Sequence, residues 1–358
     1  MSPTLTKLLD APQYSLGKEE KQLLLRPALQ HLHEWHLQRS QEYKRIASTV
    51  FSDSLLDGKL EHLPFLPVAA FKNHQLKSIP DAEILKVLTS SGTTGQQLSK
   101  IYLDKEAAQL QTRALSKIIG HVLGQKRLPM LVIDSKAVFA NPKSFSARAA
   151  GILGLAVFGK DHTYVLDENF EFDLATFEAF LERHNGNEML IFGFTFMVWL
   201  YLYQAKTDKK YDLSKAILLH SGGWKKLTDL AVTNEVFKAA LQEKFGLYKV
   251  YNFYGMIEQI GSVFVENSEG YLHCPNFADV LIRNPADFSL QPKGVPGLIQ
   301  LISALPESYP GHSILTEDIG VLMGEDDASN GWKGKYFKII GRAKKAELRG
   351  CSDTFKTP

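Results

Sequence analysis

Near the start of the chain, apolar residues recur among polar ones at the spacing of a helix. Over residues 19–48, Leu, Trp and Tyr lie among Lys, Glu, Gln and Arg, which predicts a helix. Pro64 and Pro67 exclude a helix from the later segment 60–73. Three histidines fall within the polar helix and are expected to be solvated: His31, His33 and His36. The first 60 residues are therefore expected to be mainly helical.

A second helix is predicted after a loop rich in Gly, Ser and Thr. A strand-like run, residues 83–89, precedes this loop. Beyond it, Asp104 can cap a helix, because a carboxylate oxygen accepts a hydrogen bond from a backbone N–H of the first turn. One apolar stripe follows at helical spacing: Ala107, Leu110, Ala114, Ile118 and Val122.

The middle of the chain alternates between strand-like and helix-like segments. The strand-like runs are Leu131–Ile133, Tyr164–Leu166, Met189–Phe192 and Ala216–Leu219. The helix-like segments cover about 143–157, 171–184, 195–206 and 228–245. This alternation is typical of stacked βα units around a largely parallel sheet. The sequence therefore predicts an α/β fold.

From residue 260 to 340 the pattern changes to short strands between Gly and Pro turns. The strand-like runs here are Val263–Val265, Leu298–Ile302 and Lys335–Ile340. We interpret the region as a smaller subdomain, antiparallel or barrel-like. The predicted organisation is a core over 1–340, followed by a tail. The core divides into a helical part, α/β layers and a β-rich subdomain, at 1–60, 61–259 and 260–340, and the tail is 341–358.

Composition excludes several classes of protein. The chain has 358 residues, 44% of them hydrophobic, and its 41 basic and 39 acidic residues leave a net charge of +2. This balance gives no basis for a nucleic-acid or anionic-membrane surface. The most apolar stretch, 189–203, is interrupted by Gly193 and Thr195 and is too short to span a bilayer, so no membrane insertion is expected. Two cysteines and the absence of a signal peptide indicate a cytoplasmic protein.

The strongest local signal for chemistry is the loop Ser90-Ser91-Gly92-Thr93-Thr94-Gly95, with Lys100 shortly after it. Gly92 and Gly95 can adopt positive φ, which turns consecutive backbone N–H groups toward one anion. The hydroxyls and Lys100 add donors and positive charge, as nucleotide phosphates require. The spacing is not that of a Walker A loop. An ordinary Ser/Thr/Gly turn is the alternative interpretation.

Four further motifs follow this loop in a fixed order. They are Ser221-Gly222-Gly223-Trp224, Asn252-Phe253-Tyr254-Gly255-Met256-Ile257-Glu258, Thr316-Glu317-Asp318-Ile319-Gly320 and Gly341-Arg342-Ala343-Lys344. Each motif is weak alone. Together with the loop, their order resembles the adenylate-forming superfamily of acyl-CoA synthetases, firefly-type luciferases and peptide-synthetase adenylation domains.

Three longer segments resemble one family within that superfamily. Residues 65–72 (FLPVAAFK), 308–318 (SYPGHSILTED) and 341–351 (GRAKKAELRGC) look like the LuxE-type acyl-protein synthetases, the fatty-acid-activating component of bacterial bioluminescence operons. The resemblance spans nearly the whole chain. It implies the large N-terminal domain of an adenylate-forming enzyme, with two α/β layers and a smaller β subdomain, and without the mobile C-terminal domain.

The resemblance also implies where ATP would bind. The Ser90–Gly95 loop would hold its pyrophosphate end, and Gly222, Gly223 and Trp224 would line the adenine pocket. Tyr254, next to Gly255, would stack on the adenine, because a flat aromatic face binds a purine without hydrogen bonds. Tyr254 as an ordinary core residue is the alternative.

The remaining residues of the resemblance concern the metal, the ribose and the acid. Glu258 would bind Mg²⁺ through a hard carboxylate oxygen, and a lone carboxylate between apolar residues needs a partner in any case. Asp318 would accept hydrogen bonds from the ribose, although it could also simply cap a turn. Arg342 would contact ribose or phosphate. Gly193 and Phe194 would lie at the floor of the acyl pocket.

Three departures from the superfamily narrow the assignment. Ile257 stands where a Thr is usual, and the loop before Lys100 lacks the usual Pro and is one residue longer, so the catalytic role expected of Lys100 is open. The chain ends at Pro358, so the domain that carries the superfamily's catalytic lysine is expected to be absent, as in the LuxE type. Lys344, Lys345 or Arg349 could then supply positive charge over the reacting carboxylate.

Cys351 is the candidate acyl carrier. Its tail is rich in Arg and Lys, and nearby positive charge lowers the pKa of a thiol and raises the thiolate fraction. A thiolate can attack an acyl adenylate to give a thioester, and in the LuxE type the matching cysteine carries the acyl group. An inert cysteine in a tail is the alternative. Cys274 is expected to pack in the β-rich region.

The predicted reaction is therefore activation of a carboxylic acid, expected to be a fatty acid, by ATP and Mg²⁺, followed by transfer to Cys351. The resemblance implies onward delivery to a LuxC-type acyl reductase. An acyl- or aryl-CoA ligase is one alternative, in which CoA replaces the protein thiol. A non-catalytic adenylate-binding scaffold subunit is the other, because Ile257 replaces Thr and the C-terminal domain is expected to be absent.

Overall fold

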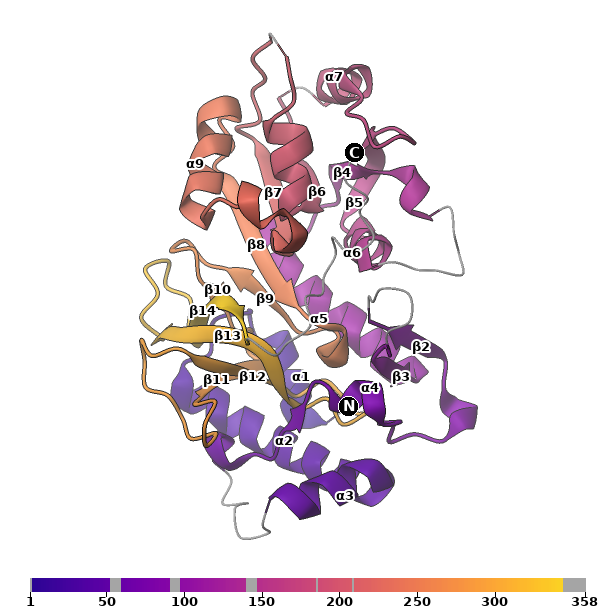
Figure 1. Cartoon of the computed structure of the whole chain (residues 1–358), viewed down its shortest axis with the longest axis vertical. Helices are drawn as coiled ribbons and strands as arrows, with labels where there is room; N and C mark the ends of the chain where they lie inside the picture. Colours follow the sequence, from indigo (N-terminus) through magenta and orange to yellow (C-terminus); the bar gives the residue numbers. More distant parts are fainter. Residues whose placement is uncertain are drawn as a thin grey trace. The chain divides into compact units, whose positions relative to one another are not determined.

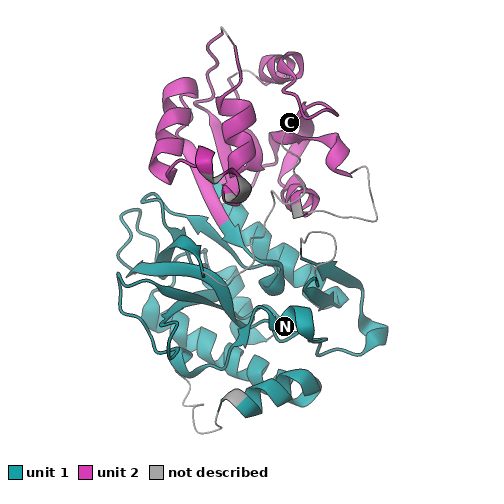
Figure 2. Cartoon of the chain, viewed as in Figure 1, with its two compact units in different colours: residues 1–90, 95–122, 254–347 teal, residues 91–94, 123–253, 348–358 magenta. Residues whose placement is uncertain are grey.

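The computed structural model describes residues 2–51, 59–90, 97–139, 147–184, 186–207 and 209–343. The chain forms two compact units, coloured separately in Figure 2. Unit 1 comprises residues 1–90, 95–122 and 254–347, and unit 2 comprises residues 91–94, 123–253 and 348–358. Within the described ranges, no helix is long and apolar enough to cross a membrane.

Unit 2 contains the parallel sheet that the alternating pattern predicted (Figure 1). Its strands run in the order β8-β7-β6-β4-β5, and each neighbouring pair is parallel. They are β4 (Leu128–Ser135), β5 (Gly159–Leu166), β6 (Met189–Phe194), β7 (Ala216–Ser221) and β8 (Lys249–Gly255), of which Tyr254 and Gly255 belong to unit 1. Strands β4 and β6 are buried along their whole length. This explains their continuous apolar sequence, because strands of a parallel sheet are covered on both faces.

The predicted helices of unit 2 are present with shifted ends. They are α6 (Ala147–Ala156), α7 (Leu174–Arg183), α8 (Thr195–Met197), which continues as a π-helical turn (Val198–Tyr203), and α9 (Asn234–Phe245). Residues 143–146 of the first predicted helix lie outside the described residues. Helix α9 begins later than predicted, because the Thr233 hydroxyl caps it by accepting from the N–H of Val236. A short 3-10 segment, Lys225–Leu230, precedes it.

Unit 1 contains an antiparallel sheet, as expected of the C-terminal region. The strand order is β11-β12-β13-β14-β10-β9, and β1 adds to β13 in parallel. The strands are β1 (Leu66–Pro67), β9 (Val263–Glu266), β10 (Leu272–His273), β11 (Ala278–Arg283), β12 (Gly297–Ser303), β13 (Ser313–Glu325) and β14 (Lys335–Arg342). The predicted strand runs of this region fall in β9, β12 and β14, while β10, β11 and β13 were not predicted.

A hairpin and a long helix complete the early part of unit 1. The predicted strand 83–89 is β2 (Lys86–Thr89), after a 3-10 turn (Asp81–Glu83), and it pairs with the unpredicted strand β3 (Lys100–Leu103). Helix α5 (Lys105–Leu123) follows, and only its last residue belongs to unit 2. The Asp104 carboxylate accepts from the N–H of Ala107 at 2.7 Å, which confirms the predicted cap.

The N-terminal helix prediction was wrong in one respect. Instead of a single helix over 19–48, the chain forms α2 (Lys18–Arg39) and α3 (Gln41–Val50), after a short α1 (Pro3–Asp10). The break is at Ser40, whose backbone is extended and whose hydroxyl caps α3 by accepting from the N–H of Tyr43. A side chain that can cap a helix thus ends one helix and begins the next.

The prediction that prolines exclude a helix from the whole segment 60–73 was wrong for its last residues. Its prolines lie outside helices, and Pro67 is in β1, yet residues Ala70–Asn73 form the one-turn helix α4. A short 3-10 turn, Leu60–His62, precedes the prolines. Proline disfavours a helix at and just before its own position but does not restrict the residues that follow it, so a helix can begin at Ala70.

Two of the three N-terminal histidines are buried, contrary to expectation. His33 and His36 are 3% and 0% exposed, whereas His31 is exposed. They continue the buried stripe of Leu25, Leu29 and Leu32 at spacings of three and four residues. His33 Nδ1 lies 2.7 Å from the Tyr43 hydroxyl, and His36 Nδ1 lies 2.7 Å from Ser78 Oγ. Burial lowers the pKa of His36 to about 3, so this imidazole is neutral and acts as a hydrogen-bonding core residue.

Candidate functional site

Tyr254, Asp318 and Arg342 meet in unit 1. Asp318 and Arg342 lie opposite each other in the ladder of β13 and β14, so their side chains are neighbours. Arg342 Nε lies 3.2 Å from Asp318 Oδ1, and Arg342 Nη2 donates to Glu317 Oε2 at 3.2 Å. The Tyr254 hydroxyl donates to Asp318 Oδ2 at 2.7 Å. Both carboxylate oxygens of Asp318 are therefore held by neighbours.

Electrostatics keep Tyr254 a hydrogen-bond donor. Burial raises the pKa of Tyr254 well above its ordinary value, and the charge of Asp318 raises it further. The phenol is therefore protonated at physiological pH. Its ring centre lies 6.4 Å from that of Phe264 and 6.5 Å from that of Phe337. The structure thus brings together the three residues for which the sequence predicted adenine and ribose contacts, and those contacts stay predictions.

Glu258 lies in the short turn that follows β8. It is the middle residue of a 3-10 turn, Ile257–Gln259, and is 6% exposed. Burial raises the pKa of Glu258, while the Ser99 hydroxyl and the positive charge of Lys72 act in the opposite direction. A buried carboxylate of this kind gains from a cation, because its charge has lost most of its hydration.

The surroundings of Glu258 suit Mg²⁺ bound together with a nucleotide. No group of three or more His, Cys, Asp or Glu that could hold a metal occurs among residues that the structure describes. Mg²⁺ in phosphate-transferring sites is commonly held by one or two carboxylates plus substrate phosphates and water. A single buried carboxylate fits that arrangement.

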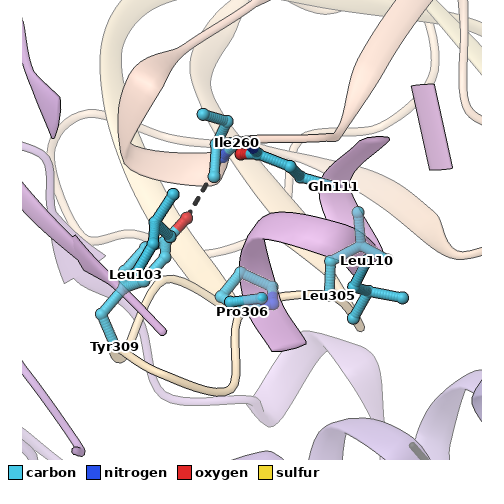
Figure 3. Close-up of a pocket in the computed structure, with 8 residues that line it drawn as sticks. Leu103, Leu110, Gln111, Ile260, Leu305, Pro306 and Tyr309 are labelled. Atoms are coloured by element: carbon cyan, nitrogen blue, oxygen red, sulfur yellow. Dashed lines mark hydrogen bonds between the residues drawn. The ribbon is translucent and has the colours of Figure 1, made fainter. Parts of the chain in front are cut away.

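The segment 308–311 braces the turn that carries Glu258. The Ile260 N–H donates to the Tyr309 hydroxyl at 3.2 Å, the dashed line in Figure 3. The Gln259 side-chain amide donates to the carbonyl of Gly311 at 3.0 Å. The segment 308–311, which the sequence singled out only by resemblance, thus contacts the Glu258 turn through the Gln259 side chain and the Ile260 backbone.

A small cavity lies beside this turn (Figure 3). Its volume is about 10 Å³, room for about one water molecule. Gln111 contributes a buried Oε1 that has no hydrogen-bond partner within the part of the chain that the structure describes. With a volume of about 10 Å³, the cavity is far too small for an acyl chain. It is lined by Leu103, Ala107, Leu110, Gln111, Ile260, Leu305, Pro306 and Tyr309.

Gly311→Ala should destabilise the protein, because Gly311 has no space for a side chain. An added Cβ would lie 2.3 Å from the Tyr309 ring and 2.6 Å from the carbonyl oxygen of Glu258. We expect a loss of about 1–3 kcal/mol in the free energy of unfolding, as in other overpacked sites, measured by denaturant titration. Gly154→Ala in α6 is the matched control, because its Cβ would meet none of the described residues within 4 Å and Ala favours helix. Equal effects of the two substitutions would contradict the bracing role of Gly311.

The neck of the Ser/Thr/Gly loop adjoins Glu258. The Ser90 N–H donates to the Ser99 carbonyl at 3.1 Å, and the Ser99 N–H donates to Ser90 Oγ at 3.0 Å. Ser99 is buried, with its hydroxyl facing Glu258, while Lys100 is exposed at the start of β3. Ser91, Gly92, Thr93, Thr94 and Gly95 lie outside the described residues, so phosphate binding by this loop stays a prediction.

The predicted acyl-pocket and adenine-loop residues occur in unit 2. A Cβ on Gly193 would lie 2.8 Å from Val198 and 2.9 Å from Ile133, so only glycine fits there. Phe194 is 4% exposed. Gly222 has φ of 80°, a conformation that favours glycine, and both Gly222 and Gly223 are exposed. The Trp224 ring centre lies 6.0 Å from that of Trp199.

The two cysteines differ sharply. Cys274 is fully buried, and burial raises the pKa of its thiol, so its thiolate fraction at physiological pH is negligible. The expectation that Cys274 packs in the β-rich region is confirmed, since its N–H donates to the Lys335 carbonyl beside β10 and β14. Cys351 and Lys344 lie outside the described residues, and their roles stay predictions.

Sequence reasoning missed three residues near the candidate site. Lys72 and Ser99 act on the ionisation of Glu258, and Glu317 pairs with Arg342. All three lie in or beside segments that carried the family resemblance. What no linear pattern shows is that residues 72, 99 and 258 come together in the fold.

Comparisons with known proteins agree with the resemblance. The family model described as "Acyl-protein synthetase, LuxE" matches residues 3–357. The long-chain-fatty-acid–luciferin-component ligase of Vibrio harveyi is 22% identical over 356 residues, which cover 96% of this chain and 90% of that protein.

Solved structures match the fold. An open conformation of 2-hydroxyisobutyryl-CoA ligase, in complex with 2-HIB-AMP and CoA, has a TM-score of 0.68 at 16% identity, covering 92% of this chain and 76% of that chain. The same ligase in its postadenylation state has a TM-score of 0.66 at 16% identity, with 91% and 69% covered. The predicted α/β fold of an adenylate-forming ligase's N-terminal domain is confirmed.

Proposed function

Since this chain belongs to the LuxE family of acyl-protein synthetases, a family of ligases, we propose that it activates a carboxylic acid with ATP and passes the acyl group to a thiol. The observation that carries the proposal is the arrangement in unit 1. There Tyr254, Asp318 and Arg342 form one cluster, and the charge of the buried Glu258 acts on Tyr254. An aromatic ring, a carboxylate and a guanidinium provide the contacts that a purine, a ribose and a phosphate require.

In the first half-reaction, a carboxylate oxygen of the acid attacks the α-phosphorus of ATP. The bond between that phosphorus and the bridging oxygen breaks, and pyrophosphate leaves. Asp318 binds the ribose hydroxyls, Tyr254 stacks on the adenine, and Arg342 offsets developing charge on phosphate. Bound Mg²⁺ would offset the charge of the phosphates, and Glu258 is the residue that would hold it. Such groups accelerate the reaction to the extent that they bind the transition state better than the substrates.

In the second half-reaction, a thiolate attacks the acyl carbonyl, a thioester forms and AMP leaves. The chain has two cysteines, and the buried thiol of Cys274 does not ionise at physiological pH. Cys351 is therefore the only remaining cysteine that could carry an acyl group on this chain. Lys344 lies near it in sequence and would help to stabilise its thiolate.

The name of the relative supports the choice of the acid, and the family resemblance supports the choice of the acceptor. The Vibrio harveyi protein is named for a long-chain fatty acid, so we propose a fatty acid as the substrate, held by a pocket that includes Gly193 and Phe194. We propose a LuxC-type acyl reductase as the partner that takes the acyl group from Cys351. Gly193 and Phe194 are both buried, and this environment supports an apolar ligand.

ATP–pyrophosphate exchange with a panel of acids tests the first half-reaction. Saturated fatty acids of graded chain length, aromatic acids and hydroxy acids should be compared at equal concentration. We expect exchange that depends on Mg²⁺ and is fastest for one range of fatty-acid chain lengths. Absence of exchange with every acid, in a protein that still binds ATP, would instead favour a non-catalytic scaffold subunit.

Asp318→Asn should mainly weaken the binding of ATP. The amide keeps the shape of the side chain, but it removes the charge that pairs with Arg342 and accepts from Tyr254. We expect the KM for ATP to rise about tenfold, since hydrogen bonds to charged groups contribute more than neutral ones, with kcat changed much less. Steady-state kinetics of exchange measure both. A fall in kcat at constant KM would contradict a ribose contact.

A further inference from the structure

A buried hydroxyl joins the ends of two neighbouring strands of unit 2. Phe194 and Ser221 are partners in the parallel ladder of β6 and β7. Thr195 directly follows Phe194 as the first residue of α8 and is 7% exposed. Its side chain therefore lies beside the residues that follow β7. Gly222 and Gly223, which directly follow β7, are proposed to line the adenine pocket together with Trp224.

Three polar atoms surround the Thr195 hydroxyl. Its oxygen lies 2.7 Å from the Gly222 carbonyl oxygen, 3.2 Å from the Ser221 carbonyl oxygen and 2.9 Å from His220 Nδ1. Carbonyl oxygens only accept, and a hydroxyl has one hydrogen. The hydroxyl therefore donates toward the carbonyls, with the shorter distance at Gly222, and accepts from His220 Nδ1–H. This assigns the tautomer of His220.

His220 is neutral, and its Nδ1 contacts the Thr195 hydroxyl. It is 1% exposed, and burial lowers its pKa to about 3. Its Nε2 is buried and has no hydrogen-bond partner among residues of the described ranges. The ring lies 4.7 Å from that of Phe237 in α9. An imidazole that uses one nitrogen on Thr195 and leaves the other buried is placed to orient a neighbour and cannot reach a ligand.

We propose that Thr195 and His220 are positioning residues for the segment 221–223, which they hold in the shape that binds the adenine of ATP. The inference rests on the proposed function for the identity of the ligand. Gly222 has φ of 80°, so its carbonyl is turned out of the strand direction and toward the hydroxyl. Loss of that hydrogen bond removes the contact that holds the Gly222 carbonyl in this orientation. The segment would then spend less time in the binding shape, which lowers apparent affinity by the same fraction.

The test is the affinity for ATP, measured by isothermal titration calorimetry without acid. For Thr195→Val we expect the Kd of ATP to rise about 5- to 10-fold, the loss of one neutral hydrogen bond. The KM for ATP in pyrophosphate exchange should rise in parallel, while kcat at saturating ATP should change by less than about twofold. Thr195→Ser keeps the hydroxyl and should bind ATP like the unchanged protein.

Two substitutions of His220 test the same hydrogen bond through its other partner. His220→Asn places an amide N–H near the position of Nδ1, whereas His220→Gln places it near Nε2. We expect Asn to keep most of the ATP affinity and Gln to lose it. This pair decides the question if Thr195→Val does not fold.

Thr176→Val is the matched control for stability. Thr176 lies in the same unit and donates its hydroxyl to Asp173 Oδ2 at 2.6 Å at the start of α7. Its loss should lower the melting temperature without changing the Kd of ATP. An unchanged Kd in both Thr195→Val and His220→Gln would overturn the positioning role. Failure of the unchanged protein to bind ATP would instead contradict the proposed function, and the inference with it.

Discussion

Glu258→Gln should abolish formation of the acyl adenylate while the protein keeps its fold. The amide has the shape of the carboxyl group but cannot ligate Mg²⁺ as a hard anion. Loss of groups that merely support a metal site costs about 10- to 100-fold in affinity or activity, so loss of the carboxylate itself should cost at least about 100-fold. Pyrophosphate exchange measures the loss. Near-normal exchange would remove Glu258 from the proposed metal site.

The same substitution should not lower stability. The pKa of Glu258 is raised in the folded chain by burial, so the fold binds the proton of this carboxyl more tightly than the unfolded chain does. At pH values above the raised pKa, the ionised form therefore costs folding free energy, and a neutral amide removes that cost. The melting temperature of Glu258→Gln at neutral pH should equal or exceed that of the unchanged protein.

Glu266→Gln is the control for these measurements. Glu266 lies in β9 of the same unit and is 1% exposed. It is as deeply buried as Glu258 but lies outside the turn Ile257–Gln259. Glu266→Gln tests the effect of an amide at another buried position. We expect the rate of pyrophosphate exchange to stay within about twofold of that of the unchanged protein, because Glu266 has no role in the proposed chemistry. Loss of exchange in both variants would point to general destabilisation.

The sequence predicted those parts of the fold in which burial produces a continuous or periodic run of apolar residues. Strands β4 and β6 are covered along their whole length, so they appear as continuous apolar runs. Strand β13 was missed because its sequence mixes apolar residues with Glu317, Asp318, Gly320 and Gly324. Its register with β14 shifts at two irregularities. That register places Asp318 opposite Arg342, and no pattern in the sequence alone shows it.

The N-terminal region shows how tertiary contacts override composition. His33 and His36 are polar residues in a polar helix, yet they occupy the stripe begun by Leu25 and Leu29. His36 Nε2 lies 3.1 Å from the Pro306 carbonyl, a partner far away in the sequence. A polar residue can be buried where such a partner satisfies it, and only the fold supplies the partner. Motif order singled out Tyr254, Glu258, Asp318 and Arg342 as candidate site residues, and the structure shows the contacts among Tyr254, Asp318 and Arg342.

Cys351→Ser should separate the two half-reactions completely. The residues proposed for adenylation lie between positions 90 and 342, whereas Cys351 follows them in a segment that contains Lys344, Lys345 and Arg349. We therefore expect pyrophosphate exchange to continue at its normal rate in the variant. Covalent labelling by the acyl group should be lost, because a serine hydroxyl is essentially never ionised at neutral pH and the Cys274 thiol is buried with a raised pKa.

Intact-mass measurement after incubation with ATP and the preferred acid checks this directly. The unchanged protein should gain the mass of one acyl group, and neutral hydroxylamine should remove it, as it removes a thioester. Addition of an acyl reductase with NADPH should also diminish the label. Cys274→Ser is the control, and it should label normally because its thiol takes no part. If Cys351→Ser were acylated as fully as the unchanged protein, Cys351 would have no role. Release of AMP dependent on CoA in that variant would then favour an acyl-CoA ligase, in which CoA takes the place of the protein thiol.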